Sequence, residues 1–152
     1  MRRSIPAVVL LALALAACGG GGSGIEVTNA RIGQPTGPNA GLYFTAENHS
    51  EGADVLESAD TGVAGSVEIH ETVTRDDGTT GMQPVDAPLE VAAGSSLVLE
   101  PGGLHLMLLD VDRIEVGETV VVTLTWQTAG DMEIEVEVVD PAETLGHDDH
   151  ED

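Results

Sequence analysis

Cysteine and lysine are the residues that this sequence most clearly lacks. One of its 152 residues is a cysteine, Cys18, and none is a lysine. Because Cys18 ends an N-terminal export signal, the rest of the chain can form no disulfide and has no thiolate for catalysis or metal binding. A blue-copper electron-transfer site, which requires a cysteine sulfur, is therefore excluded.

Positive charge is also scarce. Apart from Arg2 and Arg3, the chain has only Arg31, Arg75 and Arg113 against 27 acidic residues, and its formal net charge is −22. Such a surface repels nucleic-acid phosphates and anionic lipid head groups, so we expect no nucleic-acid partner. It attracts cations, but acidity alone is weak evidence for a metal site, since solubility or adaptation to salt explains it.

Signatures of common enzymes are missing as well. The sequence has no G-x-S-x-G, no H-E-x-x-H and no cysteine nucleophile in the folded part,. Its acidic residues are too numerous for one pair to stand out as general acid and base. We therefore predict that the protein is not an enzyme.

The N-terminus has the parts of an export signal. Arg2 and Arg3 precede an apolar run over residues 6–17, which is shorter than the roughly 20 residues of a membrane-spanning helix,. The run ends in Leu-Ala-Ala-Cys, which is similar to the bacterial lipobox, and a Gly/Ser tether follows,. We expect a lipoprotein signal peptide at 1–17 and a lipidated Cys18 with its tether at 18–24.

The protein would then be exported and held on the outer side of the cytoplasmic membrane by lipid alone, in the periplasm or at the cell surface. A plain secretion signal with an incidental cysteine is the alternative.

From residue 25 onward the chain has the pattern of short β-strands. Segments rich in Val, Ile, Leu and Thr are separated by polar or glycine-containing breaks, and no long segment has helical periodicity,. We expect turns at 75–78 and 128–131. The expected strands are residues 25–32, 41–48, 55–59, 66–74, 82–85, 96–99, 104–111, 118–127 and 132–139. The pattern predicts a single all-β domain over 25–141, an antiparallel sandwich or barrel, and a disordered acidic tail over 142–152.

Two histidines and two methionines stand out within these strands. His105 and Met107 are separated by one residue, so on a strand they project from the same face, and the leucines between and beside them point to the core,. His70 and Met82 lie on earlier strands. Spacing alone does not show that they meet the later pair, so an incidental placement of all four remains an alternative.

The chemistry of these four side chains favours one metal. Thioether sulfur is soft and uncharged and prefers Cu(I) to zinc, calcium or magnesium. Four neutral ligands would need no thiol, which suits a compartment where thiols are oxidised. We expect the imidazoles and thioethers to be exposed, so that another protein can replace them one at a time.

Over most of residues 25–139 the chain resembles the periplasmic copper(I) chaperones of the PCuAC type. The resemblance is strongest in residues 39–44 and 47–48, 65–71 (GSVEIHE), 81–85 (GMQPV) and 101–108 (PGGLHLML). It implies a cupredoxin-like antiparallel β-sandwich of the Greek-key type. It also implies an H…M…HxM motif in which His70, Met82, His105 and Met107 bind Cu(I). Thr72 is a departure, since many members have methionine there.

The resemblance also implies a function for the protein. The protein would be a metallochaperone that transfers Cu(I) toward the CuA centre of a haem–copper oxidase, as part of cytochrome oxidase assembly, with a thiol-containing assembly factor as a further partner. The alternatives are a general copper scavenging or storage protein and a structural or adhesive β-sandwich lipoprotein with incidental His and Met.

We also make a prediction for the three other histidines. His147 and His150, in the acidic tail, are candidates for a secondary site that holds Cu(II) loosely, and a solvated acidic end is the alternative. His49 lies beside an expected turn and is predicted to be a plain surface residue.

Overall fold

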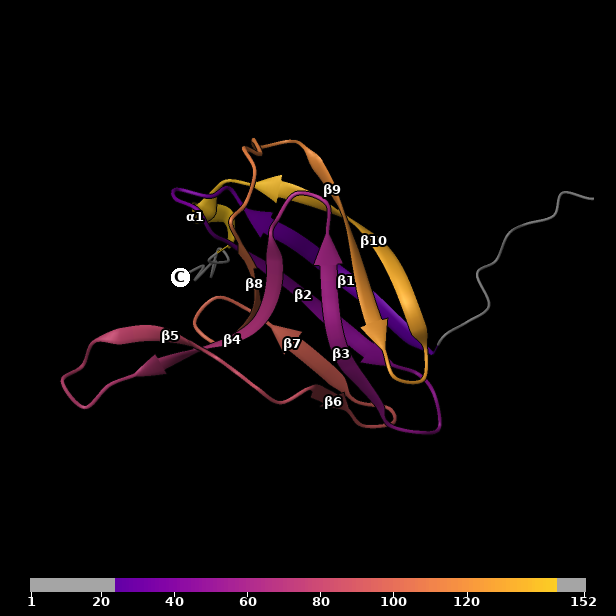
Figure 1. The fold of residues 1–152 in the computed structure, drawn as a ribbon. Coiled ribbons are helices and arrows are strands. Elements are labelled where there is room, and N and C mark those ends of the chain that lie inside the picture. Colours follow the sequence, from indigo (N-terminus) through magenta and orange to yellow (C-terminus); the bar gives the residue numbers. More distant parts are fainter. Residues whose placement is uncertain (1–23, 145–152) are drawn as a thin grey trace, which may run out of the picture.

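The computed structural model describes residues 24–144, which form ten strands and one short helix (Figure 1). The strands are β1 (Ile25–Gly33), β2 (Ala40–Asn48), β3 (Asp54–Thr61), β4 (Ser66–Thr74), β5 (Thr80–Pro84), β6 (Leu89–Val91), β7 (Ser96–Leu99), β8 (Leu104–Leu109), β9 (Thr119–Trp126) and β10 (Gly130–Val139). The helix is α1 (Pro141–Thr144). Cys18, His147 and His150 lie outside the described residues.

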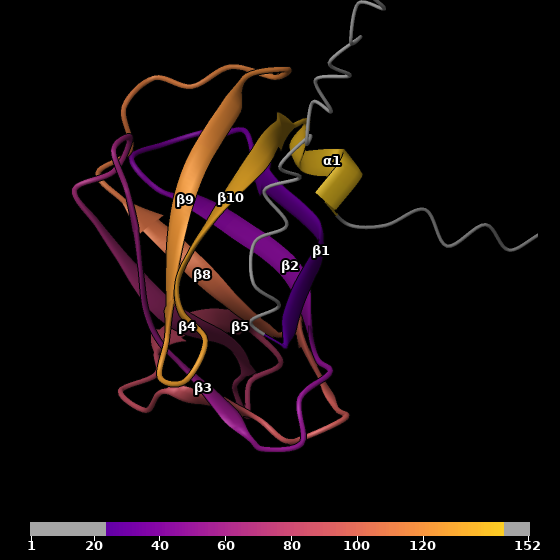
Figure 2. The same ribbon diagram turned by 90° about the vertical axis from the view of Figure 1, so that its right-hand side faces the viewer.

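The strands form one continuous sheet that folds into an open sandwich (Figure 2). Its order is β5-β4-β8-β2-β1-β10-β9-β3-β6, and β7 also pairs with β2. Neighbouring strands are antiparallel except β1 and β10, which pair in parallel from Arg31↔Glu137 to Gly33↔Val139. The prediction of a single all-β sandwich is confirmed, with this one parallel pair as an exception to the antiparallel pattern.

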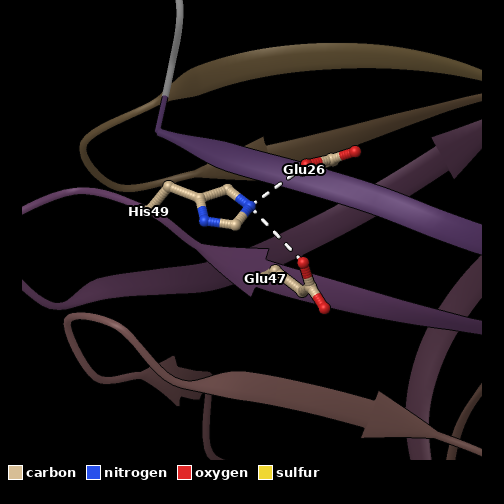
Figure 3. A group of neighbouring side chains, drawn as sticks. All are labelled: Glu26, Glu47 and His49. Atoms are coloured by element: carbon tan, nitrogen blue, oxygen red, sulfur yellow. Dashed lines mark hydrogen bonds and ion pairs between the residues drawn. The ribbon is translucent and has the colours of Figure 1, made fainter.

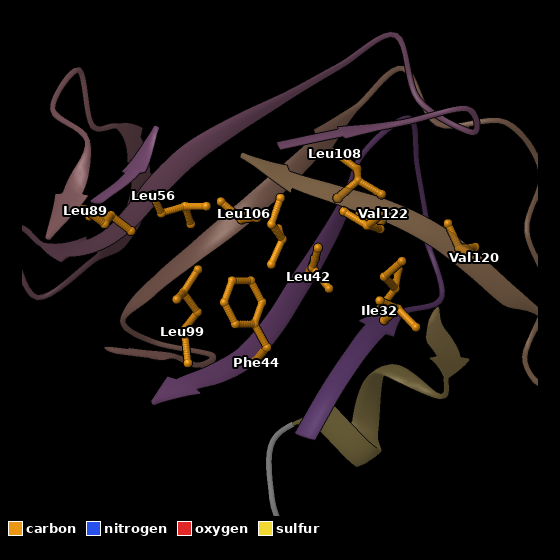
Figure 4. Packing of buried hydrophobic residues seen from close by; sticks show 14 of the residues in the cluster. Ile32, Leu42, Phe44, Leu56, Leu89, Leu99, Leu106, Leu108, Val120 and Val122 are labelled. Atoms are coloured by element: carbon orange, nitrogen blue, oxygen red, sulfur yellow. The ribbon is translucent and has the colours of Figure 1, made fainter. Parts of the chain in front are cut away.

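One core lies between the two halves of the folded sheet. Side chains from β2, β7 and β8 meet those from β3, β6 and β9 in one buried cluster (Figure 4). The alternation read from the sequence holds in β9, where Val120, Val122, Leu124 and Trp126 are all buried. Each such large apolar side chain contributes about 1.5–3 kcal/mol when it leaves water.

Two parts of the fold differ from the sequence-based expectation. Strand β6 was not predicted, because three residues after Pro88 are too short to show alternation, yet Leu89 and Val91 are buried. The acidic tail was expected from residue 142, but Ala142 to Thr144 belong to the helical turn α1. Arg31 donates a hydrogen bond of 3.1 Å to the carbonyl of the buried Thr144, a contact that no local pattern reveals.

Across residues 24–144, no helix combines the length and the apolar character required to cross a membrane.

Candidate metal centre

Three adjacent strands carry the four candidate ligands. His70 lies on β4, Met82 on β5, and His105 and Met107 on β8, and the sheet order places β4 between the other two strands. The ligands therefore come from neighbouring strands although they are far apart in the sequence.

The register of these strands turns all four side chains to the same face of the sheet. His70 is directly opposite His105, Thr72 is opposite Met82, and Glu68 is opposite Met107. Directly opposite residues of antiparallel strands project from the same face, and alternate residues of one strand do so too. The four residues thus share one face of three neighbouring strands, and their assignment as copper ligands stays a prediction.

The two histidines form the inner part of this centre. Their ring centroids are 5.9 Å apart, and the ring of Tyr43 lies 6.0 Å from that of His105 on the other side. His105 is only 1 % exposed, whereas the side chain of His70 is 13 % exposed. The expectation of exposed imidazoles is thus wrong for His105, because rings from the strands on both sides cover it.

The methionines lie in less buried surroundings. Met107 is partly buried on β8, between Glu68 of β4 and Gly41 of β2 in the strand register. Met82 is 56 % exposed on β5, which is the edge strand. The centre therefore has a shielded imidazole side and one thioether open to solvent.

Hydrogen bonds orient the two imidazole rings in opposite senses. Nε2 of His70 lies 2.9 Å from a carboxylate oxygen of Glu68, and Nδ1 of His105 lies 3.2 Å from the carbonyl oxygen of Gly103. Both partners can only accept, so these two nitrogens carry the hydrogens. The other nitrogens, Nδ1 of His70 and Nε2 of His105, are buried without a hydrogen-bond partner in the described part of the chain.

Two buried imidazole lone pairs without partners are unusual in a folded protein. A buried polar atom without a hydrogen bond costs about 1–3 kcal/mol and calls for an explanation. A metal ion bound to both nitrogens provides one, and a ligating histidine commonly donates its other N–H to a carboxylate or a carbonyl, as His70 and His105 do. The donor set thus fits a metal ion.

The protonation state of His105 suits metal binding too. Burial lowers the pKa of His105, the hydrogen bond to the Gly103 carbonyl opposes this effect, and the nearby His70 lowers the pKa further. The imidazole is therefore neutral at neutral pH, which is the form that binds a metal.

A second group of side chains, which no local sequence pattern connects, surrounds His49 (Figure 3). Nε2 of His49 lies 3.1 Å from a carboxylate oxygen of Glu26 and 3.4 Å from one of Glu47. The two glutamates face each other across β1 and β2, a register that the sequence does not show. His49 and Glu26 are exposed and Glu47 is partly buried, and the surface hydrogen bond between His49 and Glu26 accounts for the group.

Comparison with known proteins gives a family match. A family described as “Putative lipoprotein LpqE-like” matches residues 25–138. The “Putative lipoprotein Lxx21020” of Leifsonia xyli subsp. xyli is 30 % identical over 118 residues, which cover 77 % of this chain and 70 % of that protein.

Solved structures of PCuAC domains and of DR1885 share the fold. The Cu(I) form of DR1885 from Deinococcus radiodurans matches with a TM-score of 0.58 and 30 % identity over 73 % of this chain and 75 % of that one. The apo PCuAC domain from PmoF1 matches with a TM-score of 0.67 and 25 % identity over 78 % and 95 % of the two chains. The copper-bound PCuAC domain from PmoF2 matches with a TM-score of 0.65 and 23 % identity over 78 % of this chain and 94 % of that one. At this identity the match shows a likeness of fold alone. The cupredoxin-like sandwich implied by the sequence resemblance is confirmed.

These matches also bear on enzymatic activity. The family is described as one of putative lipoproteins, and the matching structures are described as a PCuAC domain and as a Cu(I)-bound protein, types that are not enzymes. The prediction that the protein is not an enzyme is confirmed.

Proposed function

The chain belongs to the LpqE-like lipoprotein family, and from this premise we propose that it is an extracytoplasmic metallochaperone whose cargo is Cu(I). His70, Met82, His105 and Met107 bind the ion. The protein carries it and passes it to another protein.

One observation carries the proposal. Two buried nitrogens without partners, Nδ1 of His70 and Nε2 of His105, belong to rings that face each other across β4 and β8, and both methionines project from the same face. Two neutral nitrogens with two thioethers favour Cu(I) over the divalent ions that carboxylates attract. The Cu(I) form of DR1885, at 30 % identity, supports this choice of ion.

The asymmetry of exposure supports a transfer role. A recipient can approach the exposed Met82 while the buried His105 still holds the ion. Exchange of one ligand at a time then moves Cu(I) between proteins without releasing it into water. A scavenging or storage protein would bind the same ion, and a structural or adhesive lipoprotein would bind none.

The proposed location and recipient rest on the expected membrane anchor. Lipidation at Cys18 would hold the domain on the outer side of the cytoplasmic membrane, and the lipoprotein family supports this. The CuA-bearing subunit of a haem–copper oxidase is the recipient that we propose, with a thiol-containing assembly factor as a further partner. His147 and His150 would hold Cu(II) loosely in the tail.

A Cu(I) titration of the mature chain against a chromogenic chelator tests binding. We expect one tight equivalent, lost in a His105→Ala, Met107→Ala double variant and retained when the residues after Thr144 are deleted. X-ray absorption should show mixed sulfur and nitrogen scattering. Unchanged binding by the double variant would refute the site, and an all-oxygen shell around copper would favour an acidic site for divalent ions instead.

Transfer needs a separate measurement. The Cu(I)-loaded chain is mixed with a reduced apo CuA-bearing domain. At intervals a one-electron oxidant is added to samples, and the absorption of the mixed-valence CuA centre is measured. Transfer at a rate above that from the copper–chelator complex supports a chaperone. Retention of the ion in the presence of the recipient would favour storage.

A further inference from the structure

Glu68 lies beside the candidate metal centre without belonging to its ligand set. It is on β4, two residues before His70, and directly opposite Met107 of β8. Its carboxylate is 2.9 Å from Nε2 of His70 and is about half exposed. Glu68 thus contacts the outer nitrogen of the ring whose inner nitrogen is buried.

This contact selects one tautomer of His70. An ionised carboxylate can only accept a hydrogen bond, so Nε2 of a neutral His70 must carry the hydrogen. The lone pair is then on Nδ1, the nitrogen that is buried without a partner in the described structure. With the hydrogen on Nδ1 instead, the ring would lose its bond to Glu68 and could not bind a metal through Nδ1.

His105 has the opposite tautomer, with the hydrogen on Nδ1, and a backbone group fixes it. Its Nδ1 is satisfied by the backbone carbonyl of Gly103, which leaves Nε2 free. No side-chain substitution removes that acceptor. Of the two imidazoles, His70 is therefore the one whose tautomer depends on a side chain.

We propose that Glu68 is a positioning residue that holds His70 as the Nε2–H tautomer and thereby presents Nδ1 to the metal ion. The inference rests on the proposed Cu(I) function for the identity of the ion, but the tautomer itself is a property of the metal-free protein. An exposed glutamate that only adds negative charge near the centre would not select a tautomer.

The test begins with the metal-free protein at pH 8. Long-range ¹H–¹⁵N spectra distinguish the two tautomers of a neutral histidine. We expect His70 as Nε2–H in the parent, a mixture of tautomers in Glu68→Ala, and partial recovery of Nε2–H in Glu68→Gln, whose amide oxygen can still accept.

Chelator competition then measures Cu(I) affinity in the same variants. Loss of such a supporting partner typically weakens metal binding about 10- to 100-fold, and we expect this of Glu68→Ala, with a smaller loss in Glu68→Gln. Glu71→Ala is the matched control. It removes the same charge from the same strand, but Glu71 projects from the other face and pairs with Gln83 at 2.7 Å.

The possible results separate the two proposals. An unchanged tautomer in Glu68→Ala, or equal losses of affinity in Glu68→Ala and Glu71→Ala, would overturn the role of Glu68. A parent chain that binds no Cu(I) would overturn the proposed function, and with it the role of Glu68 toward copper. The spectrum of the metal-free protein would still show whether Glu68 sets the tautomer. Fluorescence of the buried Trp126 confirms that each variant is folded.

Discussion

His70 and His105 lie directly opposite each other on β4 and β8, and the centroids of their rings are 5.9 Å apart. A slip of one residue in this register would turn one of the rings to the opposite face of the sheet. The centre therefore depends on correct pairing of β4 with β8. These two strands are not consecutive in the chain, because β5, β6 and β7 lie between them.

Met82→Leu tests whether the exposed thioether binds the ion. Because the side chain is 56 % exposed and leucine is similar in size, the free energy of unfolding should change by no more than about 0.5 kcal/mol,. Loss of a soft donor should weaken Cu(I) binding at least about tenfold, which corresponds to about 1.4 kcal/mol. Met132→Leu, on β10 away from the centre, is the control, and equal affinities in the two variants would contradict a role for Met82.

Thr72→Met should strengthen the centre. Thr72 is directly opposite Met82, and its hydroxyl is buried without a partner, so replacement removes an unsatisfied group and adds a third sulfur,. We expect tighter Cu(I) binding and more sulfur scattering in X-ray absorption. Thr74→Met places the same side chain two pairs further along the hairpin, on the same face, and should leave both quantities at the parent values.

Gly41→Ala should disturb the centre from the neighbouring strand. A Cβ at position 41 would meet the hydroxyl of Tyr43, whose ring packs beside His105. Overpacking of this kind costs about 1–3 kcal/mol of stability, and displacement of Tyr43 should also weaken Cu(I) binding. Gly37→Ala has open space around it and is the control. If both variants unfold at the same urea concentration, Tyr43 can move aside without cost, and the prediction is wrong.

Asp54 should control the stability of the fold in acid. Burial disfavours its charge, but hydrogen bonds from the backbone N–H groups of Thr128, Val55 and Ala129 outweigh this effect and hold the pKa of Asp54 below its usual range. Since the folded-state pKa lies below the unfolded value of about 3.9, the stabilisation is complete above that value. It is lost as the pH falls through the folded-state pKa.

Removal of this carboxylate tests the argument. Asp54→Ala should lower the free energy of unfolding at pH 7 by about 1–3 kcal/mol and reduce its dependence on pH below about 4. Trp126 fluorescence in urea, measured at several pH values, gives both quantities. Asp60→Ala, at an exposed position on the same strand, should retain the parent profile. A parallel shift of both variants would assign the effect to net charge.

The strands and the core were largely predictable from the sequence. The apolar alternation of residues 120–126 and the turn at 75–78 are local patterns, and the structure has both. The shared face of His105 and Met107 follows from their spacing alone. A local pattern reports which side of a strand a residue occupies, and that was sufficient for these features.

The assembly of the centre was not predictable in the same way. Which strands are neighbours, and in what register, depends on pairing between distant segments, so the burial of His105 between Tyr43 and His70 could not be foreseen. The free nitrogen of each imidazole depends on Glu68 and on the Gly103 carbonyl. The resemblance to a known family supplied the grouping of ligands that periodicity left open.

The β4–β5 hairpin extends beyond the body of the sandwich (Figure 1). Strand β8 pairs with β4 only over residues 66–71, so the outer half of the hairpin consists of two strands alone. Two-stranded ribbons are marginally stable in water, and local opening begins in such segments. Fraying of this arm would carry Met82 away while His70 and His105 stay in place. In a chain that carries Cu(I) as proposed, release of the ion would then depend on local opening of this hairpin and would not require unfolding of the whole domain.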